Sequence, residues 1–212
     1  MRIWDICCGT KSVSNVWREN GDEILTLDID PKCEPDICTD IITWEYTDFG
    51  LDNLDVIWCS PPCTHYSIAR TNAKTPRDLI GSDAMVQKCL DIIAFWRPKY
   101  WVIENPQTGL LKTREVVQGL NFKDVDYCMY GAPYRKRTRI WTNCHWISRP
   151  LCTHETHPMT AQKGPSKRAG QLIQSDNCSL QTLHSIPQGL TMEIMLHCTN
   201  EQTQETPIQD GS

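Results

Sequence analysis

The sequence predicts an α/β fold in which helices cover both faces of a mostly parallel, Rossmann-like sheet, with one small loop-rich insert. Strand-like and helix-like segments alternate along much of the chain, and such alternation is typical of parallel sheets. The strand-like segments are continuous apolar runs, as expected for strands that are buried on both faces. The 212 residues are enough for one domain with a substantial core.

The first elements are predicted in the order strand, helix, strand and strand. RIWDIC (2–7) is the first strand. SVSNVWREN (12–20) is expected to form a helix that ends at Gly21, because glycine readily adopts the left-handed conformation found at helix ends. EILTLDID (23–30) is the second strand and has acidic residues at its carboxyl end, and LDVIWCS (54–60) is the third.

The middle of the chain contains the clearest helix. SDAMVQKCLDIIAFWRP (82–98) has apolar residues at helical spacing; Ser82 or Asp83 can cap it, and Pro98 ends it. KYWVIENP (99–106) is a further strand that stops at a proline.

Two late strands, DVDYCMYGAP (124–133) and TRIWTN (138–143), are expected on either side of a basic cluster. Beyond them the sequence becomes rich in Pro, Thr, Ser and Gln and loses its periodicity. The predicted division is a core at 1–142, a short loop-rich insert at 143–180, a closing helix at 181–198 and a disordered tail at 199–212.

Composition limits the environment and the partners of the protein. No run of about 20 apolar residues is present to span a bilayer, and the start RIWDICC is a strand pattern, unlike a signal peptide. We therefore expect a cytoplasmic protein, or a nuclear one in a eukaryotic host, whose 12 cysteines are thiols, ligands or nucleophiles. Net charge is −5, but the cluster YRKRTR (134–139) can still bind a phosphate backbone.

A strand that runs directly into Ser-Pro-Pro-Cys is the most informative local feature. Pro61 and Pro62 remove two backbone donors and fix two φ angles, so the strand must stop there. Ligands bind at the carboxyl ends of strands in open α/β sheets. Cys63 leaves the strand at this edge and precedes polar residues, which makes it the candidate nucleophile.

The strand WVIENP supplies a second candidate group. Glu104 follows four apolar residues, and a carboxylate in that position lies at a binding cleft or needs a buried partner. In a doubly wound sheet, Cys63 and Glu104 are expected at the same edge, on adjacent strands. A nucleophile beside an acid is the arrangement required for addition to an electron-poor ring.

The turn DICCGTKS after the first strand is a candidate cofactor loop, although Gly9 is its only glycine. Asp28 at the end of the second strand can accept the hydroxyls of a ribose. No phosphate-binding motif is present, which favours a nucleoside-type cofactor over a dinucleotide.

Five segments, DICCG, LDID, SPPCTHYS, ENP and YGAPYRKRTRIW, resemble in order and spacing the DNA cytosine-C5 methyltransferases. The resemblance covers about two thirds of the chain and is strongest in the last three segments. It implies a class I methyltransferase fold, S-adenosylmethionine as methyl donor and DNA as substrate.

The resemblance also implies roles for individual residues. Cys63 would attack C6 of a cytosine flipped out of the duplex, Glu104 would engage N3, and C5 would take the methyl group. Arg137 and Arg139 would contact the backbone phosphate and the target base. The implied donor-binding residues are Asp5, Gly9, Asp28, Ile29, Asp40, Ser60 and Pro61. The implied substrate-binding residues are Pro62, Ser67, Asn105 and Arg135.

The chain departs from the family pattern in several places. The donor turn lacks the family's additional glycines, Tyr134 is an extra residue, and Arg135 stands where a glutamine is usual. The target-recognition region, 143–180, is short enough to read a small site or none. The chain is similar to the compact members found in phages and other viruses; we expect a monomer, and a restriction partner is left open.

The segment NCHWISRPLCTHETH offers a possible structural zinc site. Thiol and imidazole ligands can hold zinc in a small loop-rich unit. The spacing is irregular, and the alternative is a set of scattered polar and buried side chains. The zinc candidates are Cys144, Cys152, His154 and His157.

Three other functions compete with cytosine-C5 methylation. Ser-Pro-Pro also resembles the loop of methyltransferases that act on exocyclic amino groups of cytosine or adenine, although Cys63 stands at the aromatic position of that loop. A catalytically inactive fold that binds DNA or protein would fit the short recognition region. RNA is a further possible substrate, because a flipped cytosine in a tRNA loop poses the same chemical problem.

Overall fold

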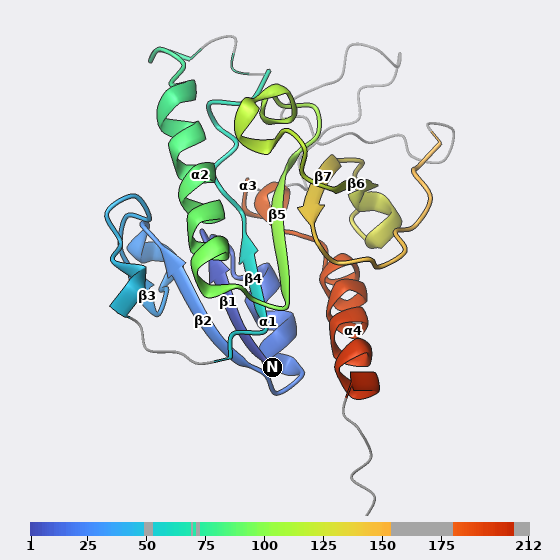
Figure 1. Ribbon diagram of the computed structural model, residues 1–212. Coiled ribbons are helices and arrows are strands. Elements are labelled where there is room, and N and C mark those ends of the chain that lie inside the picture. Colours follow the sequence, from blue (N-terminus) through green and yellow to red (C-terminus); the bar gives the residue numbers. More distant parts are fainter. Residues whose placement is uncertain (49–52, 69, 71–72, 154–179, 206–212) are drawn as a thin grey trace, which may run out of the picture.

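The computed structural model of the protein describes residues 1–48, 53–68, 70, 73–153 and 180–205. Its centre is one sheet in the order β3-β2-β1-β4-β5-β7-β6 (Figure 1). The strands are β1 (Arg2–Ile6), β2 (Glu23–Asp28), β3 (Ile37–Cys38), β4 (Val56–Cys59), β5 (Tyr100–Pro106), β6 (Phe122–Asp126) and β7 (Arg137–Thr142).

The sheet is mostly parallel, as predicted. Neighbouring strands from β3 to β5 run parallel, whereas β7 is antiparallel to both of its neighbours, β5 and β6. The direction of strand order reverses at β1: β2 and β3 follow on one side of it, and β4 and β5 follow on the other. A crevice at the carboxyl ends of such strands is the usual ligand site of this architecture.

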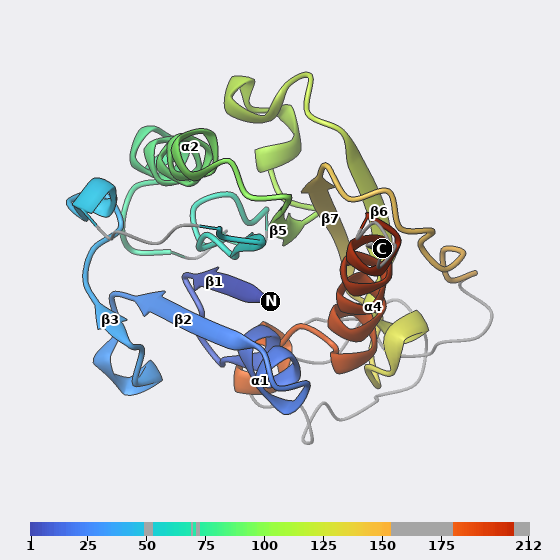
Figure 2. The ribbon, with the colours of Figure 1, turned by 60° about the horizontal axis from the view of Figure 1, so that its bottom comes forward.

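Helices cover both faces of the sheet (Figure 2). The α2 helix (Leu79–Trp96) lies on one face, and α1 (Ser12–Glu19) and α4 (Gln188–Glu205) lie together on the other. The α3 helix (Leu180–His184) is one short turn before α4. Helices, parallel strands and the continuous apolar runs thus confirm the predicted fold class.

The start of α2 differs from the sequence expectation. Asp78 caps the helix, because its side chain accepts a hydrogen bond of 2.8 Å from the backbone N–H of Gly81. Neither Ser82 nor Asp83 is the cap, and Asp83 instead binds the side chains of Tyr66 and Arg114. The helix therefore begins one turn earlier than predicted.

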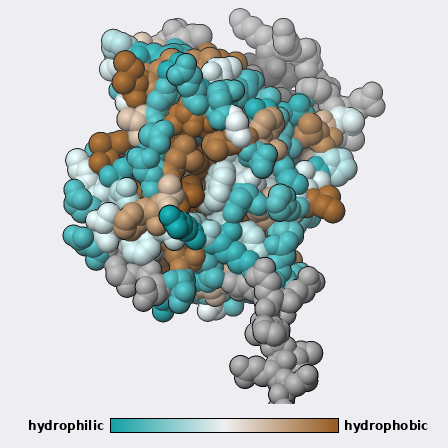
Figure 3. Space-filling model, viewed as in Figure 1, coloured by the Kyte–Doolittle hydropathy of each residue, from teal (hydrophilic) through white to brown (hydrophobic). Residues whose placement is uncertain are grey.

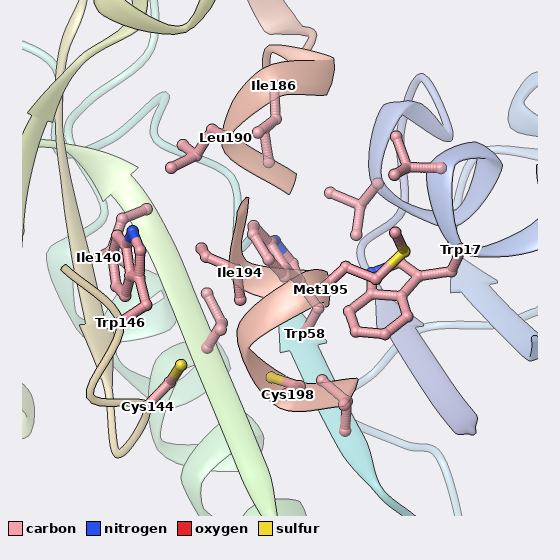
Figure 4. Close-up of a cluster of buried hydrophobic side chains, with 14 of the residues drawn as sticks. Trp17, Trp58, Ile140, Cys144, Trp146, Ile186, Leu190, Ile194, Met195 and Cys198 are labelled. Carbon is pink, nitrogen blue, oxygen red and sulfur yellow. The ribbon is translucent and has the colours of Figure 1, made fainter. Parts of the chain in front are cut away.

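The core has two parts that correspond to the two covered faces. Figure 4 shows the part between the sheet and α4, where Trp58 lies beside Ile194 and Trp17 lies beside Met195. The other part joins α2 to the opposite face of the sheet. On the face in Figure 3, apolar residues form a band over α2 and the strands beside it. Across the described ranges, no helix is both long and apolar enough to cross a membrane.

The C-terminal segment needs two corrections. The predicted helix at 181–198 is two helices, α3 and α4, and α4 continues to Glu205 into the predicted disordered tail. Contacts to the core explain the extension: Tyr100 donates a 2.5 Å hydrogen bond to Glu201, which also pairs with His197 at 3.1 Å. Most of the predicted insert, 154–179, lies outside the described residues, as does 206–212.

The late strand predicted at 124–133 is also shorter and earlier than expected. It is β6, which ends at Asp126, and a 3₁₀ helix (Tyr127–Tyr130) follows it. Gly131 then adopts a φ of +98°, a left-handed conformation that glycine permits without steric cost.

Candidate active site

A cavity of about 450 Å³ lies where the carboxyl ends of the central strands meet. The turn after β1 and the end of β2 form one part of its wall, and the turn after β4 and the end of β5 form another. This volume is within the range of small-molecule sites. The cavity brings together Gly9, Asp28, Cys63, Glu104 and Asn105.

The turn that carries Cys63 is held on both sides. Before it, Asn105 donates a 2.8 Å side-chain hydrogen bond to the carbonyl of Pro61. After it, the carbonyl of Cys63 accepts backbone hydrogen bonds from Tyr66 (3.1 Å) and Ser67 (2.9 Å). The two prolines leave few donors of their own, so these contacts fix the position of the thiol.

Tyr66 anchors the same turn to the body of the protein. Its ring is fully buried, and its hydroxyl donates a 2.9 Å hydrogen bond to Asp83 of α2. Arg114 makes a bidentate contact with the same carboxylate, with a shortest distance of 2.6 Å. The reactive turn is therefore tied to α2 and to the segment after β5.

Glu104 faces the cavity from β5, the parallel neighbour of β4. The placement of Cys63 and Glu104 on adjacent strand ends confirms the geometric expectation from the sequence. Glu104 is 6% exposed and accepts a 2.7 Å hydrogen bond from the hydroxyl of Tyr127. This bond leaves one carboxylate oxygen, Oε2, for another partner.

Two charged groups act in opposite directions on the thiol of Cys63. Burial raises the pKa of Cys63, and the carboxylate of Glu104 raises it further, whereas the ammonium of Lys136 lowers it. The thiolate thus depends on nearby positive charge.

The other end of the cavity has the features of a nucleoside site. Gly9 adopts a φ of +46°, and its N–H donates a 2.9 Å hydrogen bond to Oδ2 of Asp28. The N–H of Asp30 donates to Oδ1 of Asp28 at 2.9 Å. Two backbone donors therefore orient the Asp28 carboxylate, whose remaining lone pairs can accept ribose hydroxyls.

A buried atom without a partner also points to a ligand. Asn105 is fully buried, and within the described ranges its Oδ1 accepts no hydrogen bond. Asn105 lines the cavity, so a donor group on a bound molecule could satisfy this oxygen. Ser60 and Pro61, predicted at the donor site, and Pro62, predicted at the substrate site, line the same cavity.

Outside the basic cluster, four predicted ligand-binding residues do not line this cavity. Ile29 is 64% exposed, Asp40 accepts a 3.0 Å hydrogen bond from the N–H of Ile42, and Ser67 lies beyond the reactive turn. Asp5 is buried beneath the first turn, where it accepts a 3.2 Å hydrogen bond from the N–H of Ser14. Their proposed ligand contacts stay predictions.

The arginines of the basic cluster do not line the cavity either. Arg137 makes a bidentate ion pair with Asp126, and Arg139 makes one with Asp124. In the register of β6 and β7 these are directly opposed pairs, which brings the charges together across the strands. Arg135 joins Asp126 at 3.4 Å. The structure does not bring the three arginines to Cys63.

Several residues in and around the cavity were not predicted from the sequence. Lys136, which lines the cavity, and Tyr127, which binds Glu104, were given no individual role. Strand alternation was the available signal, because Lys136 must face opposite to the arginines beside it. Residues 184 and 186, far away in the sequence, also line the cavity, and no local pattern indicated them.

The predicted zinc site is not supported. Cys144 is buried close to Cys198 of α4 (Figure 4), and Cys152 lies beside Cys128. Among the residues that the structure describes, no group of three or more Cys, His, Asp or Glu side chains is arranged to hold a metal ion. His154 and His157 lie outside the described residues.

Asp5 should make folding stability depend on pH. Burial raises the pKa of Asp5 to about 7 from 3.8, so its stabilising contribution is present at low pH and is lost as pH rises through 7. Between pH 5 and pH 8.5 the loss should be about 3 kcal/mol, from roughly two pKa units. Asp5→Asn stays neutral and can keep the Ser14 hydrogen bond. Urea unfolding of both proteins at both pH values should show the difference; a pH-independent difference would contradict the assignment.

Comparison with known proteins places this geometry in context. A family model described as C-5 cytosine-specific DNA methylase matches residues 1–132. A protein of frog virus 3 (isolate Goorha), described as a DNA (cytosine-5)-methyltransferase, is 32% identical over 179 residues, covering 78% of this chain and 81% of the viral protein.

Solved structures resemble the chain at low sequence identity. A protein encoded within an E. coli prophage and described as a DNA modification methyltransferase has a TM-score of 0.51 and 15% identity, with 67% of this chain and 46% of that chain covered. The Dnmt2 methyltransferase of S. pombe has a TM-score of 0.46 and 17% identity, with 67% and 50% covered. The chain thus spans about half the length of these two structures.

Proposed function

Since the chain belongs to the C-5 cytosine-specific DNA methylase family, we propose that it transfers a methyl group from S-adenosylmethionine to C5 of cytosine in DNA, through a covalent adduct of Cys63. The observation that carries the proposal is one cavity shared by Cys63, Glu104 and Asp28. The cavity can therefore offer a nucleophile and an acid to the cytosine, and a hydrogen-bond acceptor to the ribose of the methyl donor.

The proposed reaction begins at Cys63. Its thiolate forms a bond to C6 of an extruded cytosine, and the π electrons of the C5–C6 double bond make C5 nucleophilic while Glu104 engages N3. Bound S-adenosylmethionine supplies an electrophilic methyl group, which C5 takes. Loss of the C5 proton to solvent then restores the double bond and breaks the S–C6 bond, which frees the thiolate.

The donor fits the end of the cavity near β1 and β2. Asp28 would accept the ribose hydroxyls, and Gly9 allows close approach of the backbone. Asn105 would hold the Pro61 carbonyl and offer its free Oδ1 to a ligand donor. Asp5, Ile29 and Asp40 complete the proposed donor set on the family resemblance alone.

DNA is the proposed substrate, and the target base must leave the helix to reach Cys63. Extrusion costs a few kcal/mol, which contacts in the pocket must offset. We propose backbone contacts for Arg135, Arg137 and Arg139, which would require them to share or exchange their aspartate partners on β6.

Tritiated methyl transfer followed by nucleoside analysis tests the function. We expect label in 5-methylcytosine after incubation with double-stranded DNA. Label in N4-methylcytosine or N6-methyladenine would favour the amino-methyltransferase alternative, and label in RNA alone would change the substrate class. Absence of transfer to DNA and RNA of mixed sequence would contradict an enzymatic role.

A further inference from the structure

Lys136 is the cation of the basic cluster that faces the catalytic cavity. Lys136 directly precedes β7, and side chains alternate between the two faces of an extended chain, so Lys136 faces away from Arg135 and Arg137. Those two arginines bind Asp126, whereas Lys136 lines the cavity with Cys63 and Glu104. The local sequence therefore separates the cluster into paired arginines and one cavity lysine.

The contacts of Lys136 hold its ammonium in place without an ion pair to any residue that the structure describes. Nζ donates a 3.2 Å hydrogen bond to the carbonyl of Leu183 and lies 4.8 Å from the ring centroid of Tyr127. Within the described part of the chain, no carboxylate lies at ion-pair distance from it. The hydroxyl of the same Tyr127 binds Glu104, so one aromatic side chain positions both the cation and the acid.

The positive charge of Lys136 acts on the thiol of Cys63. Of the charged or titratable groups that line the cavity, Glu104 and Lys136 are the two that shift the pKa of Cys63, in opposite directions. The others lie on the walls formed by the turn after β1, by β2 and the segment after it, and by the end of α3: Cys7, Cys8, Asp28, Lys32, Cys33 and His184. Lys136 is thus the positively charged group of the cavity that favours the thiolate form of Cys63.

We propose that Lys136 is the cationic group of the catalytic site: it stabilises the Cys63 thiolate and then the negative charge that moves onto the pyrimidine when sulfur bonds to C6. This inference rests on the proposed function. The sulfur lone pair forms the S–C6 bond, and charge shifts into the ring toward O2 and N3. Lys136 keeps its proton throughout: methyl transfer to C5 neutralises this charge, loss of the C5 proton restores it, and it returns to sulfur when the S–C6 bond breaks.

The first test measures the thiol without DNA or donor. The rate at which iodoacetamide alkylates Cys63 is followed by mass spectrometry of its peptide over a pH series. Lys136→Met should slow alkylation at pH 8 by about fivefold or more, because the thiolate fraction falls. Lys136→Arg should keep most of the rate, since it keeps the charge.

The chain supplies a matched control in Lys123. Its amine also donates to a backbone carbonyl, that of Trp146, and lies 5.1 Å from the centroid of the Trp146 ring, but it does not line the cavity. Lys123→Met should leave Cys63 alkylation within about twofold of wild type. Equal alkylation rates in the Lys136→Met and Lys123→Met proteins would overturn the proposal.

Methyl transfer provides the second readout. Lys136→Met should lower kcat/KM by about a hundredfold, as expected when a stabiliser of developing charge is removed. Unchanged kcat/KM would overturn the catalytic role even with slowed alkylation. A wild-type protein that transfers no methyl group would instead refute the proposed function, and the alkylation comparison would still decide whether Lys136 acts on Cys63.

Discussion

Replacing Cys63 with serine should lower methyl transfer to cytosine by at least about a thousandfold, because a neutral hydroxyl is a far weaker nucleophile than a thiolate. The turn itself should survive the change. Its contacts run through the backbone of Cys63, the carbonyl of Pro61 and the side chain of Tyr66, none of which the substitution removes. Unfolding free energy should change by about 1 kcal/mol or less.

A duplex with 5-fluorocytosine at target positions tests the covalent step directly. Fluorine at C5 cannot leave as a proton does, so the S–C6 bond should persist after methyl transfer and shift the protein on a denaturing gel. Wild type should form the adduct, and the Cys63→Ser protein should not. Cys38→Ser is the matched control, because Cys38 is exposed and lies outside the cavity. Near-normal transfer by the Cys63→Ser protein would refute the nucleophilic role.

Local signals account for the parts of the site that the sequence predicted. The buried run of β4 and its two prolines determine where Cys63 emerges, and parallel order then places Glu104 on the next strand end. The positions of Cys63 and Glu104 follow from the rigid proline turn and from the parallel direction of the two strands. They hold without knowledge of any distant contact.

The arginines show where local reasoning stops. Their direction depends on the antiparallel register that sets Asp124 opposite Arg139 and Asp126 opposite Arg137. The spacing of two aspartates on one strand matches that of two arginines on the other, but the sequence does not show that these strands are neighbours. The length of α4 has the same origin, since its last turns depend on a hydrogen bond from Tyr100 on β5.

Lys136 could have been predicted from the sequence by strand alternation. Once two arginines are assigned to one face, the residue between Arg135 and Arg137 belongs to the other. The direction of that face still required the pairing of Glu104 with Ile140 across β5 and β7. Alternation along the chain shows only that Lys136 and the arginines lie on opposite faces. The register between β5 and β7 decides which of the two faces meets the cavity.

Glu104→Gln should lower the rate of methyl transfer by about a hundredfold or more, because an amide cannot replace the acid at N3 of the ring. Donor affinity should stay within about threefold of wild type, since Asp28 and Gly9 are carried by different strand ends. Single-turnover rates and donor titrations separate the two quantities. Glu115→Gln, an exposed site on the segment after β5, is the control. Equal losses in rate and donor affinity would count against the assigned role.

The same substitution should have the opposite effect on the free thiol. The Glu104 carboxylate raises the pKa of Cys63, so its removal should increase the thiolate fraction and speed alkylation by iodoacetamide at pH 8. Loss of structure would also expose Cys63 and relieve the burial that raises its pKa, so the Glu104→Gln protein must first show the urea unfolding curve of wild type; faster alkylation is then due to the lost carboxylate. If alkylation and methyl transfer both slow in the Glu104→Gln protein, Glu104 acts by supporting the turn, and the acid at N3 must be sought elsewhere.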